Sequence, residues 1–185
     1  MAKKSKFKLG TIPLICGVVG ILALCLFMFL PMISYSIGES SSTTYQGLAM
    51  IFGGEANTVT VAKKIIGEGT TTSQGTIEGV TFNFMTFLPW ILTLVGSLVL
   101  VTSSFVKQLS NNLFKFVGGG LVLAGGILMF FVTDSASLAI CGGNENALEA
   151  SLLLGKYALS TGAILGGILG CVAGGGTIAS LIISK

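Results

Sequence analysis

The chain has 185 residues, of which 52% are hydrophobic and only 9% are charged. Soluble domains carry about 25% charged residues, so the composition excludes a water-soluble fold. There is no His, and all ten basic residues are Lys, which excludes imidazole metal sites, His-based acid–base catalysis and Arg clamps on phosphate. The net charge of +3 does not indicate nucleic-acid binding, because the charges sort by membrane side.

Four apolar blocks are long enough to cross a hydrocarbon layer about 30 Å thick. We expect them at about residues 9–33, 84–105, 113–132 and 157–183. An outer loop at 34–83, a short inner turn at 106–112 and a second outer loop at 133–156 connect them. The prediction is one membrane domain over 1–185, an all-α four-helix transmembrane bundle with a small antiparallel β-sheet in the first outer loop.

The first block follows several lysines, as the apolar region of a signal peptide does. It is longer than the roughly 7–15 residues of such a region, and it ends in Leu30-Pro31-Met32-Ile33 without a small-x-small cleavage site. A lipoprotein signal at Leu22-Ala23-Leu24-Cys25 is disfavoured because Leu24 replaces the small residue expected before the cysteine. We therefore expect an uncleaved first helix.

The lysines predict how the helices are oriented. With the N-terminus inside, seven lysines lie on the inner side: Lys3, Lys4, Lys6, Lys8, Lys107, Lys115 and Lys185. The outer side holds the other three and every acid: Lys63, Lys64, Lys156, Glu39, Glu55, Glu68, Glu78, Asp134, Glu145 and Glu149. The positive-inside rule then predicts cytoplasmic N- and C-termini in a plasma membrane. Lys-only usage and the absence of N-x-[ST] sequons suggest a low-GC bacterium.

The first outer loop contains period-two patterns typical of strands. Thr58–Val61 and Thr76–Phe84 predict a hairpin around a flexible connection at 67–75, and Thr44–Phe52 predicts a third strand. We expect the hairpin's second strand to lead into the second membrane helix. The alternative, a disordered Ser/Thr-rich loop, is disfavoured because disordered segments are poor in aromatic and branched residues. If this loop recognises a partner, the candidates are Tyr45, Leu48 and Phe52.

In the second outer loop, Asn144 is a candidate N-cap for a fourth helix that begins outside the membrane. Trp90 is a candidate interfacial anchor of the second helix, and the pair Lys156 and Tyr157 of the fourth. Cys141 is the only cysteine outside the apolar blocks. No C-x-x-C pair exists, so neither a disulfide nor a zinc site is expected.

Glycines recur every four residues along one face of the fourth block. This glycine zipper comprises Gly162, Gly166, Gly170 and Gly174, with Gly167 and Gly175 in a second row. Small residues at this spacing let a second helix approach closely. The favoured interpretation is packing against the glycines of the third helix within the chain; the alternative is an interface between subunits.

No Asp or Glu lies inside the four blocks, and the only charge there is Lys115, near the inner end of the third. A rotor ring, a proton pump, an ion-coupled transporter or a voltage sensor needs such charges. The membrane hydroxyl groups have no base to activate them. We therefore expect no catalytic, cofactor or metal site, and a protein that is not an enzyme.

The segment Tyr45-Gln46-Gly47-Leu48-Ala49 lies where claudins carry Gly-Leu-Trp. Together with four helices, a long β-prone first outer loop and a shorter second one, it resembles the claudin and PMP22-like tetraspan proteins. Ala49 stands in place of the Trp, and both loop cysteines are missing. The resemblance therefore implies the layout of that group, without its junction-forming activity.

These observations favour a multi-pass scaffold, accessory subunit or contact-mediating protein that acts through its outer loop and glycine-rich helix. The expected partners are the lipid bilayer and another membrane protein or further copies of the chain, and no nucleic acid. The alternative is a small oligomeric channel or transporter-like protein for an uncharged solute or lipid.

Overall fold

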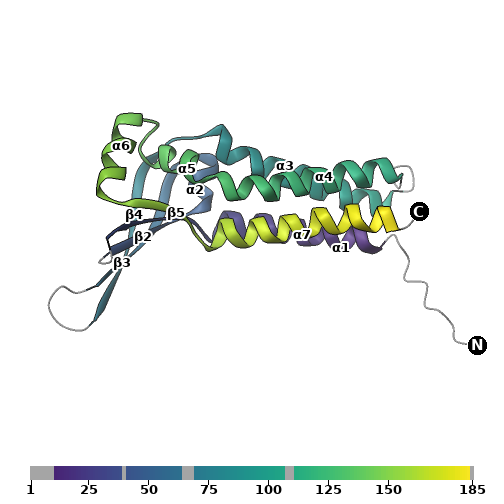
Figure 1. Ribbon diagram of the computed structural model, residues 1–185, viewed down its shortest axis with the longest axis horizontal. Helices are drawn as coiled ribbons and strands as arrows, with labels where there is room; N and C mark the ends of the chain where they lie inside the picture. The colour runs from purple at the N-terminus through teal and green to yellow at the C-terminus, as the bar shows by residue number, and fades with distance from the viewer. Residues whose placement is uncertain (1–10, 39–40, 64–68, 107–110, 184–185) are drawn as a thin grey trace, which may run out of the picture.

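The computed structural model describes residues 11–38, 41–63, 69–106 and 111–183. Four of its helices are long and apolar enough to cross a membrane: α1 (Thr11–Phe29), α3 (Phe84–Phe105), α4 (Asn112–Leu128) with its continuation η2 (Met129–Phe131), and α7 (Thr161–Ile183). They form an elongated bundle in the order α1, α3, α4, α7, and each helix packs on its two neighbours (Figure 1). The prediction of four long apolar helices is confirmed.

The other elements form a head at one end of the bundle (Figure 1). Its centre is an antiparallel sheet of five strands in the order β4-β3-β2-β1-β5. The strands are β1 (Pro31–Ile37), β2 (Ser41–Gln46), β3 (Gly54–Lys63), β4 (Thr70–Val80) and β5 (Lys156–Leu159). Three helices complete the head: α2 (Gly47–Phe52), α5 (Thr133–Ile140) and α6 (Glu145–Leu154). An antiparallel sheet is therefore present, as predicted, and it is larger than expected.

Two helix ends differ from the predicted spans. Helix α1 ends at Phe29, and Pro31 begins a strand, so residues 30–33 are not helical. A residue that precedes proline is biased toward extended backbone, which fits a helix that stops here. At the other end of the chain, residues 156–159 pair with β1, so α7 begins only at Thr161.

The bounds of the predicted strands also differ from those in the structure. Thr58–Val61 lies in β3, but Thr44–Phe52 is divided: β2 ends at Gln46, and residues 47–52 form α2. Gly47 sits so close to the Phe27 carbonyl oxygen that a side chain would collide with it. Strand β4 already begins at Thr70, within the predicted flexible connection, and ends at Val80. Residues 67 and 68 lie outside the described ranges.

Asn144 caps a helix as predicted, because its side chain accepts hydrogen bonds from the backbone N–H groups of Asn146 and Ala147. That helix is α6, however, and it is separate from α7. It ends at Leu154, and β5 stands between the two helices. The fifth strand thereby joins the chain segment before α7 to the segment after α1.

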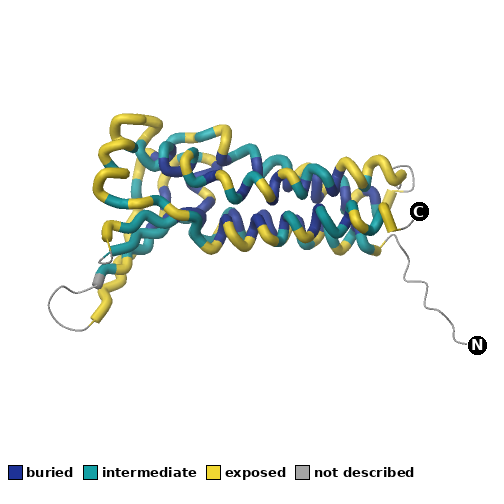
Figure 2. The backbone as a smooth tube through the Cα atoms, viewed as in Figure 1, coloured by how far each residue is buried: buried dark blue, intermediate teal, exposed yellow. Residues whose placement is uncertain are grey.

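One hydrophobic core runs from the head into the adjoining end of the bundle (Figure 2). Its largest fully buried side chains come from α1, β1, α2 and η2, and they include Phe27, Met32, Ile33, Met50, Ile51 and Met129. A buried hydrogen bond at 2.6 Å from the Thr86 hydroxyl to the Met50 carbonyl oxygen ties α2 to α3. The head is therefore packed onto the bundle and is not a loosely tethered loop.

Candidate contact surfaces

The glycines of α7 face the rest of the chain. Around Gly162 lie three carbonyl oxygens, those of Leu26, Leu30 and Pro31. Gly166 packs against Phe27 and Met129. A Cβ on Gly162 would lie 2.8 Å from the Pro31 carbonyl oxygen, closer than real side chains come, and one on Gly166 would lie 3.1–3.2 Å from its neighbours, a tight contact that requires a small shift. The first two glycines of the row, Gly162 and Gly166, therefore pack against α1, the residues that follow it, and η2.

The later glycines of the row, Gly170 and Gly174, pack against α4. A Cβ on Gly170 would lie 2.8 Å from the Gly126 Cα atom, and one on Gly174 would lie 2.6 Å from the Gly119 carbonyl oxygen. A Cβ on Gly167 would lie 2.7 Å from the ring of Phe130, whereas nothing lies within 4 Å of a Cβ on Gly175. The structure therefore places these glycines, except Gly175, in contacts within the chain. Gly167, Gly170 and Gly174 meet Gly126 or Gly119 of α4, whereas Gly162 and Gly166 meet α1, the residues after it and η2, so the expected packing against the glycines of the third helix describes only part of the row.

Several Ser and Thr hydroxyl groups in the bundle donate hydrogen bonds to backbone carbonyl oxygens of their own helix. Thr93, Ser103 and Thr177 each donate a hydrogen bond of 2.8–2.9 Å to a carbonyl oxygen three or four residues earlier. The Oγ atom of Ser97 is buried without a hydrogen-bond partner among the described residues, and it lies against Gly20 of α1. Hydroxyl groups bonded in this way are the ordinary means by which a membrane helix satisfies Ser and Thr.

The predicted recognition residues do not form one surface. Tyr45 is only 5% exposed and lies in the core of the head, so its aromatic character reflects packing; the expectation that it faces a partner is wrong. Leu48 and Phe52 are exposed on α2. The Phe52 ring packs edge-on to Trp90, with centroids 5.1 Å apart, and Phe87 completes this aromatic cluster. Trp90, predicted as an interfacial anchor, is half-buried here.

Lys156 and Tyr157 lie in β5 and not at the start of a helix. Tyr157 is paired with Tyr35 across β1 and β5, and the two ring centroids are 4.6 Å apart. The Tyr35 hydroxyl donates to the Ser151 carbonyl oxygen at 2.8 Å. The Cys141 sulfur lies 3.8 Å from the Tyr157 hydroxyl oxygen. All four cysteines are free thiols.

Burial raises the pKa of Tyr157 to about 12, with a smaller contribution in the same direction from Cys141, while the hydrogen bond with Ser151 lowers it. The phenol of an unfolded tyrosine ionises near pH 10. The folded state therefore favours the neutral phenol. Its stabilising contribution is complete below about pH 10 and is lost as the pH rises through the folded pKa of Tyr157.

We expect a phenolate absorbance titration of the detergent-solubilised protein to show a step near pH 12 that Tyr157→Phe removes. Because the Ser151 hydrogen bond lowers this pKa, Ser151→Ala should move the step to still higher pH. A step that persists unchanged in Tyr157→Phe would show that another group causes it.

The head exposes a continuous apolar surface that the sequence did not reveal. Leu152, Leu153 and Leu154 at the end of α6 are 51%, 88% and 70% exposed. The helix has no buried residue. It lies at the end of the molecule opposite the end of α3 and the start of α4 (Figure 1, Figure 2). We call Leu152–Leu154 the leucine surface. From the sequence, these leucines lie in the second outer loop, in the part of the fourth helix expected to begin outside the membrane near Asn144, whereas in the structure their helix ends at Leu154.

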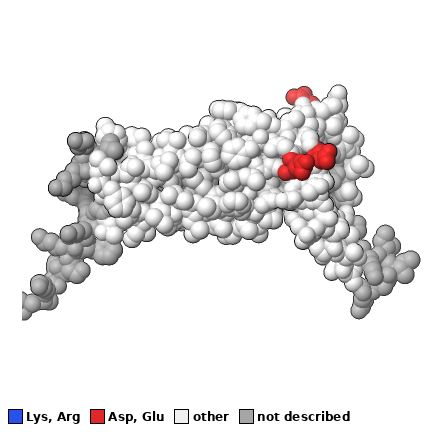
Figure 3. Space-filling view, turned by 180° about the vertical axis from the view of Figure 1, so that it is seen from behind, with Lys and Arg blue, Asp and Glu red and all other residues white. Residues whose placement is uncertain are grey.

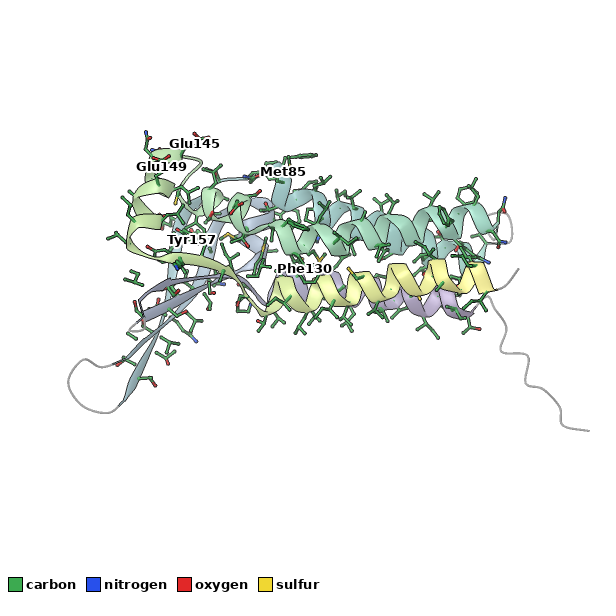
Figure 4. The ribbon with its side chains drawn as sticks, in the orientation of Figure 1. Met85, Phe130, Glu145, Glu149 and Tyr157 are labelled. Carbon is green, nitrogen blue, oxygen red and sulfur yellow. The ribbon has the colours of Figure 1, made fainter. Side chains whose placement is uncertain are left out.

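Two hollows border α6. One, of about 360 Å³, is lined by the leucine surface with Ser36, Gly38, Gly155 and Lys156. The other is a cleft of about 460 Å³ between α6, α5 and the start of α3, lined by Asn83, Met85, Asp134, Ser135, Leu138, Glu145, Leu148, Glu149 and Leu152. The acids visible in Figure 3 all lie on the head. Figure 4 shows Glu145 and Glu149 together on α6, with Met85 across at the bundle end.

The described part of the chain contains no group of three or more His, Cys, Asp or Glu side chains placed to hold a metal ion. The lysines 3, 4, 6, 8, 64, 107 and 185 and the acids Glu39 and Glu68, on which the predicted orientation rests, lie outside the described residues. No protein-family model matches the chain, and no curated protein matches its sequence.

Proposed function

We propose that this protein is a non-enzymatic, four-span plasma-membrane protein that makes protein contacts through its head. The observation that carries the proposal is the leucine surface, in which Leu153 is 88% exposed on a helix without buried residues. Exposed apolar patches on soluble parts of proteins mark interaction sites, because leaving them in water costs about 25 cal/mol per Å². The bilayer does not relieve this cost if the head stands outside it.

The position of the head supports an extracellular contact. The lysine distribution along the sequence favours a cytoplasmic location for both chain ends. The start of α1 and the end of α7 lie at the end of the bundle opposite the head (Figure 1). The described acids on the head, such as Glu145 and Glu149, agree with this orientation. A bacterial plasma membrane then places α6 on the outer side of the cell.

The packing of the bundle supports a scaffold more than a conduction path. Gly126 and Gly170 bring the backbones of α4 and α7 into contact, and the Phe130 ring lies against Gly167. Lys115 is the only charged residue in the described spans. Such a bundle holds the head at a fixed position, which is what a contact protein requires.

We further propose that the layout is that of the claudin and PMP22-like tetraspan group. The support is a first head segment that supplies four strands between α1 and α3, and a shorter second segment between α4 and α7. Gly47 and Leu48, which resemble the claudin Gly-Leu-Trp, begin α2. Ala49, in place of the Trp, is 4% exposed and packs in the core of the head.

The contact is tested with a photo-crosslinking amino acid at position 153 in intact cells. A protein adduct of defined mass is expected there, and none at position 172, because Val172 is exposed on the apolar span α7. Exclusively lipid adducts at 153 would overturn the proposal. Passage of glycerol through proteoliposomes of the purified protein, without an adduct at 153, would favour the channel alternative.

A further inference from the structure

The cleft between α6, α5 and the start of α3 combines acidic and apolar side chains in one hollow of about 460 Å³. Its three carboxylates belong to Asp134 of α5 and to Glu145 and Glu149, which lie together on α6 (Figure 4). All three acids are exposed, and none has an ion-pair partner within the part of the chain that the structure describes. No described lysine lines the cleft, so its negative charge is not neutralised there.

The same cleft also has an apolar lining. Leu138 of α5 and Leu148 of α6 line it half-buried, and the exposed Met85 lines it from the start of α3. Leu152 lines both this cleft and the hollow beside the leucine surface, so the cleft continues into that surface. Its volume lies within the range of about 300–1,000 Å³ that is typical of ligand pockets. An occupant that fits must therefore offer apolar side chains as well as positive charge.

We infer that the cleft binds a cationic, amphipathic segment of a partner protein, one that carries lysine or arginine beside apolar side chains. This inference rests on the proposed contact function and gives the chemistry of the partner. The basic groups of the segment contact the carboxylates on α5 and α6, and its apolar side chains lie on Leu138 and Leu148. Complementary charge across an interface speeds association and rejects partners of the wrong sign.

Other occupants fit the cleft less well. A bare metal ion needs several ligands that converge on one point, and no group of three or more acidic, Cys or His side chains in the described part of the chain is placed to hold one. An anionic lipid surface attracts basic residues and would be repelled by three acids. An uncharged apolar segment would leave the acids without a partner. A cationic, amphipathic segment matches both the carboxylates and the apolar lining.

The test uses the full-length protein in nanodiscs of zwitterionic phosphatidylcholine and two fluorescent peptides with blocked ends, Lys-Leu-Leu-Lys and Glu-Leu-Leu-Glu. After subtraction of the signal from empty nanodiscs, fluorescence anisotropy should show at least tenfold tighter binding of the basic peptide. This binding should weaken as salt is added, because exposed charges are screened. Changing Glu145→Gln and Glu149→Gln together should weaken it at least threefold, whereas Glu78→Gln, on β4 outside the cleft, should leave it unchanged.

Carbodiimide coupling then locates the bound peptide, because this reagent joins a lysine amine to a carboxylate that it contacts. Mass spectrometry should find the basic peptide on Glu145 or Glu149 at least fivefold more often than on Glu55 and Glu78, which are exposed on β3 and β4. Equal coupling at all four acids, or equal affinity of the two peptides, would overturn the inference. A protein adduct at position 153 in that case would keep the contact function and assign it a partner of different chemistry, whereas loss of both results would reject the proposed function as well.

Discussion

Replacing Gly174 by Val is expected to destabilise the protein severely, while the same change at the next residue, Gly175, leaves it folded. A Cβ at Gly174 would lie 2.6 Å from the Gly119 carbonyl oxygen and would collide with the Leu123 backbone nitrogen. Both obstacles are backbone atoms of α4, so no rotamer change relieves them and the two helices must separate. At Gly175 nothing lies within 4 Å of the added carbon.

Overpacking a well-packed interior costs typically about 1–3 kcal/mol, and a backbone obstacle places Gly174→Val at or above the upper end of that range. For a chain of this size, about 3 kcal/mol corresponds to a fall in Tm of roughly 6–12 °C. Thermal unfolding followed by circular dichroism in one detergent measures both variants. Equal Tm values for Gly174→Val and Gly175→Val would show that α7 does not pack on α4 through this row.

Replacing Phe27 by Ala should lower the stability of the head and the bundle by the same amount, so that the two parts unfold together at a lower denaturant concentration. Phe27 is fully buried, and it belongs to the core that also contains Met32, Ala163 and Met129. Removing a buried phenylalanine side chain costs about 3–5 kcal/mol, since the cavity it leaves closes only in part. Because this core spans β1, η2 and α7, the loss is shared by both parts of the molecule.

Phe29 provides the matched control. It lies two residues later on the same helix and is 59% exposed, so Phe29→Ala should change stability little. Far-UV circular dichroism monitors the helices, and Trp90 fluorescence monitors the junction of head and bundle. Coincident transitions at reduced denaturant are expected for Phe27→Ala. A bundle transition that stays at its wild-type midpoint would show that head and bundle unfold independently.

The apolar spans were predictable because hydropathy is a local property of the chain. Helix α3 occupies the predicted residues 84–105, and α4 with η2 lies within one residue of its prediction. The ends of α1 and α7 were not predictable in this way. Residues 31–33 and 156–159 are largely apolar, and although Pro31 disfavours a continued helix, only pairing between distant segments makes them strands: Pro31 and Ile33 pair with β2, and Ile33 also pairs with Leu159 of β5. That pairing joins residues as far apart in the sequence as Ser34 and Ala158, which hydropathy cannot detect.

The residues of the candidate contact site were harder to predict from the sequence than the apolar helices. Tyr45 and Leu153 are both large and lie in connections between spans, yet one is 5% and the other 88% exposed. An aromatic residue in a loop predicts burial and recognition equally well, and three consecutive leucines after an N-cap at Asn144 predict a helix that continues into the fourth apolar block. Those leucines end a separate helix because strand β5 begins at Lys156, directly after Gly155, and interrupts the helix.

The sequence by itself determined that the chain has four helices long and apolar enough to cross a membrane, that they carry no acid and no His, and that small residues line one face of the last of them. These are properties of residue type and spacing. Only the tertiary structure decided that this face is covered by α1 and α4, that a fifth strand joins the two head segments, and that α6 presents its leucines outward. The physical reason is that burial depends on contacts between segments distant in the chain, and the same apolar residue serves a core, a membrane or a partner.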